Sequence, residues 1–134
     1  MNWYALFADL IAVFHFGYVV FVILGLFVIL LGGLLRWHFI RNFWFRVTHL
    51  AMILIVVFEA LLGITCPLTE WENDFRVAAG QQVSDLSFVA RLIHYVIFLD
   101  FPPIVFTVAH CLFGLAILAS WWVYPPYLPK WKER

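Results

Sequence analysis

The chain has 134 residues, of which 66% are hydrophobic and only 12% are charged. Soluble domains contain roughly 45–50% apolar residues, and one this small has too little interior to bury so many large side chains, so composition excludes a soluble globular domain. The formal net charge is zero, which gives no basic footprint for nucleic acid, and we expect no nucleic-acid partner.

Three long apolar runs predict three transmembrane helices in an all-α membrane protein. A helix needs about 20 apolar residues to cross the hydrocarbon core of a bilayer. The predicted spans cover residues 5–35, 45–66 and 102–124. Pro102-Pro103 suits the first turn of the third span, where the missing N–H of proline costs no helical hydrogen bond. Because no repeat or flexible linker is visible, we expect a single transmembrane domain over residues 1–134, surrounded by the lipid bilayer.

Basic residues predict the orientation of these spans. Two segments carry them: the connector after the first span, with Arg36, Arg41 and Arg46, and the tail, with Lys130, Lys132 and Arg134. Because cytoplasmic segments are enriched in Lys and Arg, both are predicted to be cytoplasmic. Three crossings satisfy this condition, with the N-terminus outside, the C-terminus in the cytoplasm, and residues 67–101 outside.

Residues 86–99 are apolar but shorter than a normal span, and they contain Arg91 and His94. A fourth span here would place the basic tail outside the cytoplasm, so we predict a helix that lies on the outer face. A short or re-entrant membrane helix is the alternative. Residues 67–101 together are expected to form a lid over the outer end of the spans.

The lid begins with the polar stretch at residues 66–76, which predicts a capped helix. Thr69 and Glu72 have the Thr-x-x-Glu spacing of a capping box, so the helix is expected to start near Glu70. Gly80 is expected to end it. Glu72 and Arg76 are four residues apart and are predicted to form an ion pair.

The same stretch also carries a resemblance to a known family. Cys66-Pro67-Leu68-Thr69, then Glu72-Asn73 and Arg76, resemble the signature of small bacterial inner-membrane proteins catalogued as a domain of unknown function. Further similar positions are Asp9, His15, His49, Glu59 and His94. The resemblance implies three or four helices in a bacterial inner membrane, and it implies no activity.

Ionisable residues are predicted to gather in the outer half of the bundle. Depths counted at about 1.5 Å per residue place five of them there: Asp9, His15, Glu59, His94 and His110. Such groups usually face a bundle interior or a cavity. We therefore expect any ligand site to lie between Glu59, His15 and the lid at residues 69–99. Arg76 and Arg91 are the expected partners of a buried Glu59.

Small and sulfur-containing residues in the spans are expected to have structural roles. Gly17, Gly25 and Gly32 are predicted to mark close helix packing. Cys66 and Cys111 are expected at different depths, so two free thiols are predicted.

The favoured function is that of an accessory or partner-binding subunit of a larger membrane complex, formed with other membrane proteins or with a second copy of the chain. Three spans enclose little volume of their own, and a 20% aromatic content suits packing against a larger protein.

Two other classes of function remain open from the residues alone. A redox or metal-binding protein would hold b-type haem through His15, His94 or His110, or a metal ion through His15, Glu59 and His94. An intramembrane enzyme would use Glu59 with His15 or His94 as acid–base groups. Against both, a single histidine in a span commonly binds a neighbouring backbone carbonyl.

Overall fold

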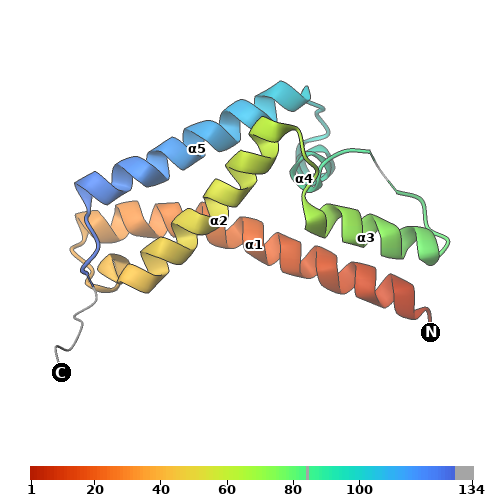
Figure 1. Cartoon of the computed structure of the whole chain (residues 1–134), viewed down its shortest axis with the longest axis horizontal. Coiled ribbons are helices and arrows are strands. Elements are labelled where there is room, and N and C mark those ends of the chain that lie inside the picture. The colour runs from red at the N-terminus through yellow and green to blue at the C-terminus, as the bar shows by residue number, and fades with distance from the viewer. Residues whose placement is uncertain (84, 129–134) are drawn as a thin grey trace.

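The computed structural model describes residues 1–83 and 85–128, and every regular element in that part of the chain is a helix (Figure 1). In chain order the elements are α1 (Trp3–Leu34), the 3-10 turn η1 (Phe39–Arg41), α2 (Phe43–Leu62), α3 (Pro67–Ala78), α4 (Phe88–Ile97) and α5 (Pro103–Val123). α1, α2 and α5 are long and apolar enough to cross a membrane. The predicted fold class, an all-α membrane protein with three spans and shorter additional helices, is confirmed.

The three spans differ in length. α2 has 20 residues and α5 has 21, and each is therefore about 30 Å long, which matches the hydrocarbon core of a bilayer. α1 has 32 residues and is about 48 Å long. Its N-cap residue is Asn2, whose side chain accepts hydrogen bonds from the N–H groups of Tyr4 and Ala5. α1 is thus longer than a bilayer requires.

The three spans lie close together at one end of the molecule, and toward the other end α1 diverges from α2 and α5 (Figure 1). We call the end with η1 the connector end and the end with α3 and α4 the lid end. The core lies between the spans, where Val22 and Leu26 of α1 pack with Ile53 of α2 and Ile117 of α5. In Figure 1, α1 and α5 move apart toward the lid end, and α4, seen almost end on, lies between α3 and the end of α2.

Close packing of α1 against α2 depends on a glycine. Gly25 has no side chain, and the ring of His49 occupies the space that a Cβ atom would need. His49 is fully buried, and its Nε2 donates to the Val22 carbonyl oxygen at 2.8 Å. Gly32 approaches Ile40 in the same way, whereas a Cβ at Gly17 would meet open space. Two of the three predicted packing glycines therefore have that role.

Arg46 joins α2 to the end of α5 at the connector end. Its side chain is fully buried and donates to the Tyr124 carbonyl oxygen at 2.6 Å and to the Ser120 hydroxyl at 3.0 Å. The guanidinium also lies over the ring of Trp121, 5.5 Å from its centroid. Arg46 is therefore a packing residue as well as one of the basic residues of the connector.

The lid begins earlier than the capping-box spacing predicts. α3 starts at Pro67, with Cys66 as its N-cap residue, so the predicted start near Glu70 is wrong. A residue before proline prefers extended backbone, and proline suits the first helical position, so Cys66-Pro67 decides the start. Thr69 is consequently buried inside the first turn. Gly80 ends the helix as predicted, with φ at +78°.

α4 occupies most of the ambiguous stretch at residues 86–99. Its N-cap is Ser87, whose hydroxyl accepts from the Ala90 N–H, and it ends at Phe98, which has a left-handed φ of +61°. Whether α4 lies on the outer face stays a prediction. The basic tail residues Lys130, Lys132 and Arg134 lie outside the described residues.

Candidate functional site

α3 packs along the first turns of α1 at the lid end. The Asn2 side-chain amide donates to the Ala79 carbonyl oxygen at 3.2 Å. Phe75 of α3 stacks on Tyr4 and contacts Phe7, with ring centroids 6.4 Å and 5.6 Å apart. These contacts cover part of the length by which α1 exceeds a bilayer.

Glu72 is the buried carboxylate of the lid. Its side chain is only 1% exposed. It accepts from Arg76 Nε at 2.8 Å and from both terminal nitrogens of Arg91, at 3.1 and 3.2 Å. Two parallel N–H···O contacts from one guanidinium are the fork geometry in which an Arg–carboxylate pair is strongest. Glu72 of α3 thereby holds α4 through Arg91.

Arg76 extends this ion-pair network to α1. Its NH1 donates to Asp9 Oδ1 at 3.2 Å and to the Gln81 side chain at 3.0 Å. We call Asp9, Glu72, Arg76 and Arg91 the lid clamp. The clamp contains two carboxylates and two guanidinium groups, and it ties α1, α3 and α4 together.

The clamp determines the protonation of its members. Burial alone would raise the pKa of Glu72, but hydrogen bonds and charges from Arg91 and Arg76 hold that pKa below its usual value. Burial lowers the pKa of Arg76, and its contacts with Glu72 and Asp9 outweigh burial and raise it. Glu72 is therefore ionised at neutral pH. The structure gives Glu72, rather than Glu59, the role of partner to Arg76 and Arg91.

His15 lies beside the clamp, where α1 meets α4. The residue is 7% exposed, and its ring stacks on Phe88 with centroids 4.1 Å apart. Its Nε2 is 4.0 Å from Cys66 Sγ, and its Nδ1 has no hydrogen-bond partner within the described part of the chain. The predicted proximity of His15 to the lid is thus present, with Cys66 and Phe88 as its neighbours.

Cys66 connects His15 to Glu59. Burial raises the pKa of the Cys66 thiol, the backbone N–H groups of Leu68 and Thr69 partly oppose this, and the nearby Glu59 carboxylate adds to the increase. A thiol in this state is protonated at neutral pH and is a weak nucleophile. Cys66 and Cys111 are both free. The arrangement therefore favours a packing role for Cys66 over nucleophilic catalysis.

Glu59 lies in the last turns of α2 and is only partly buried. Its neighbours include Cys66 and Tyr18 of α1. Within residues 1–83 and 85–128 it forms no ion pair: the clamp guanidinium groups bind Glu72 and Asp9 instead. Glu59 is thus a carboxylate on a membrane span without a cation from the described chain.

The other predicted ligand histidines bind elsewhere. His94 Nδ1 pairs with Asp100 at 2.7 Å, and both side chains are about half exposed or more. His110 Nδ1 donates to the Phe106 carbonyl oxygen of its own helix at 2.6 Å. Neither of these contacts brings His94 or His110 to His15. No group of three or more His, Cys, Asp or Glu side chains among the described residues is placed to hold a metal ion.

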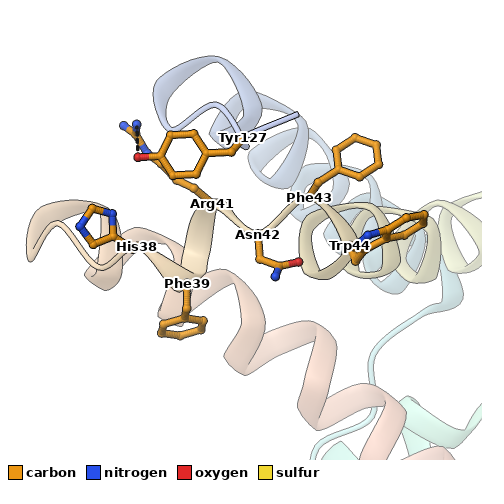
Figure 2. A pocket seen from close by; sticks show the side chains of 7 residues that line it. All are labelled: His38, Phe39, Arg41, Asn42, Phe43, Trp44 and Tyr127. Atoms are coloured by element: carbon orange, nitrogen blue, oxygen red, sulfur yellow. Dashed lines mark hydrogen bonds between the residues drawn. The ribbon is translucent and has the colours of Figure 1, made fainter. Parts of the chain in front are cut away.

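A second feature lies at the connector end and was not identified from the sequence. It is a shallow hollow of about 520 Å³ lined by His38, Phe39, residues 41–44 and Tyr127 (Figure 2). Arg41 reaches the Tyr127 hydroxyl at 3.5 Å, and the Arg41 carbonyl oxygen accepts from the Tyr127 N–H at 2.8 Å. The basic, aromatic composition of residues 36–46 is the sequence signal that points to it.

Comparison with known proteins places the chain at the level of a family. The family model described as "Protein of Unknown function (DUF2784)" matches residues 5–126. This match confirms the resemblance to a family of unknown function. No curated protein and no solved structure matches the chain.

Proposed function

The chain belongs to the DUF2784 family, whose function is unknown, and from this premise we propose that it is a partner-binding subunit of a larger complex in the bacterial inner membrane. The observation that carries the proposal is Glu59, which has no cation partner among the described residues. Carboxylates within spans are costly in lipid and usually pair with another polar group or line a cavity. A partner helix that brings a cation or a hydrogen-bond donor would supply the missing group.

The exposed spans support the same proposal. In the most apolar stretch of each helix, only 28% of α1 and 17% each of α2 and α5 is buried within the chain. Near Glu59, the exposed residues of α2 include Ile55, Phe58 and Leu62. α1 diverges from α5 toward the lid end (Figure 1), and these three residues of α2 are not covered by the described part of the chain. A partner helix would bury the apolar residues and Glu59 together.

The lid clamp supports the proposal by holding α3 and α4 in place near Glu59. Arg91 holds α4 next to His15, and Cys66 at the start of α3 lies against Glu59. Because the lid is already fixed, it loses less conformational entropy when a partner binds, and this favours binding. The clamp residues are thus positioning residues for the partner surface.

Haem or metal binding is the second candidate, and one observation favours it. His15 is buried and its Nδ1 has no described hydrogen-bond partner, so this atom is open to a ligand. His94 and His110, however, already bind Asp100 and the Phe106 carbonyl. We therefore rank the partner-binding function first. An absorption spectrum of the purified chain, reduced minus oxidised, separates the two candidates.

We expect Glu59→Gln to weaken partner binding. Losing one charge-assisted interaction costs about 1.5–3 kcal/mol of binding free energy, which lowers the affinity tenfold or more. The measurement is purification of the tagged chain in mild detergent, followed by the mass of the complex and identification of its subunits; a mass of two copies would identify self-association. Glu70→Gln, at an exposed residue of α3, is the matched control. A complex of unchanged composition and yield in Glu59→Gln at normal abundance would contradict the proposal.

The orientation is part of the proposal, because it decides which compartment a partner must reach. We expect the N-terminus and the lid outside and the C-terminus in the cytoplasm, from the basic connector and tail. Reporter fusions at Gly80 and after Arg134 should read outside and cytoplasm, respectively. Two reporters on the same side would overturn the three-span topology.

A further inference from the structure

We propose that the hollow at the connector end binds the phosphate group of an anionic phospholipid. The first reason is the distribution of charge. Every carboxylate among the described residues lies at residue 9 or within residues 59–100, and residues 35–58 and 104–128 contain none. His38 and Arg41, which line the hollow, therefore face no acidic side chain at their own end of the described chain.

The guanidinium of Arg41 has unused donors. Its recorded side-chain contacts are a hydrogen bond of 3.5 Å to the Tyr127 hydroxyl and a position over the Tyr127 ring, 5.4 Å from the centroid. Arginine carries five N–H donors in a planar fork that matches a phosphate. Arg41 is held in place by Tyr127 while most of its donors point to no acceptor within the described residues.

The hollow also supplies polar groups beside Arg41. Figure 2 shows Arg41 and Tyr127 along one edge, Asn42 in the middle, and Phe43 and Trp44 where α2 begins. The Asn42 side chain accepts from the Phe45 N–H. The N–H groups of Phe43 and Trp44 have no hydrogen-bond acceptor among the described residues. These groups carry the positive end of the helix dipole, which adds to the charge of Arg41.

Aromatic side chains identify the level of the hollow in the membrane. Phe39, Trp44 and Tyr127 are 54%, 69% and 52% exposed around it. Trp and Tyr are enriched where the hydrocarbon core meets the head groups, which is the level of lipid phosphates. An open, shallow shape with apolar walls suits a lipid whose acyl chains run along α2. Free phosphate has no apolar part that could pack against those walls.

The test measures lipid selectivity in nanodiscs that contain phosphatidylcholine with increasing phosphatidylglycerol. Lipid bound to the purified chain is counted by mass spectrometry. We expect the wild type to retain phosphatidylglycerol over phosphatidylcholine, and we expect Arg41→Gln to reduce this preference about tenfold, as for the loss of one charge-assisted contact. Arg36→Gln removes the same charge from an exposed position of the same connector, outside the hollow, and should leave the preference unchanged.

Two further measurements keep the proposal falsifiable. Arg41→Lys keeps the charge but loses the planar fork, so the preference should fall by less than in Arg41→Gln. This partial loss tests the proposal if Arg41→Gln does not accumulate. Inorganic phosphate should not displace the bound lipid. The proposal is overturned if the wild type shows no preference, if Arg36→Gln and Arg41→Gln lower it equally, if Arg41→Lys abolishes it, or if phosphate alone competes.

Discussion

Glu72→Gln is expected to destabilise the lid by about 3–5 kcal/mol, the usual cost of removing one partner from a buried ion pair. The variant keeps the shape of the side chain but leaves Arg91 and Arg76 without the carboxylate that both bind. Because these two contacts hold α3 and α4, the loss should be local. Hydrogen exchange in detergent should show faster exchange over residues 67–97 and little change over α2 and α5.

The control for this prediction is Glu70→Gln, which removes an exposed acid from the same helix and should leave exchange unchanged. Asp9→Asn should have a small effect, since Asp9 is 64% exposed in its contact with Arg76. Wild-type exchange over α3 and α4 in Glu72→Gln would show that the clamp does not hold the lid.

The same ion pairs predict how the lid responds to pH. The folded-state pKa of Glu72 lies below its ordinary value of 4.5, so folding favours the ionised form. The stabilisation is fully present above about pH 4.5 and is lost as pH falls through the folded pKa. The protection of α3 and α4 against exchange, relative to the intrinsic rate at each pH, should therefore fall in the wild type only in acid. Glu72→Gln should lack this acid-dependent step.

Gly25→Ala is expected to separate α1 from α2. The new Cβ would lie 2.5 Å from His49 Nε2, closer than side chains approach. His49 is fully buried and bonded to the Val22 carbonyl, so it has no free space to enter. Overpacking and an unsatisfied imidazole together should cost about 2–5 kcal/mol. Thermal unfolding in detergent measures the change.

Gly17→Ala is the matched control on the same helix. A Cβ there meets open space, and alanine favours a helix over glycine by about 1 kcal/mol, so this variant should be neutral or slightly stabilised. His49→Ala combined with Gly25→Ala should recover part of the loss, because it removes the clashing ring. Equal stabilities for Gly25→Ala and Gly17→Ala would contradict the proposed packing.

The sequence was sufficient for the features that depend on local pattern. Hydropathy and length predicted three spans, and Gly80 predicted the end of the lid helix. The start of that helix was missed because two local signals competed: the Thr69–Glu72 spacing suggested a capping box, whereas Pro67 favours the first helical position and selects the earlier start.

The pairing of charges was harder to predict, because it depends on how helices sit against one another. Depth counted along the chain placed Glu59 near the lid, but it does not say which carboxylate faces Arg91; the structure buries Glu72 there. For the same reason the sequence alone did not distinguish the roles of the connector arginines, Arg36, Arg41 and Arg46. Arg46 is fully buried against α5, whereas Arg36 is exposed.

The length of α1 has a mechanical consequence. One continuous helix without proline runs from Asn2, which binds the end of α3, to Gly33, which lies against Tyr124 near the connector hollow. A straight rod that packs against His49 at Gly25, nearer its connector end than its lid end, acts as a lever. Tilting its lid end must displace its connector end in the opposite direction. A displacement at one end of α1 would therefore be transmitted to the other end through a single continuous helix.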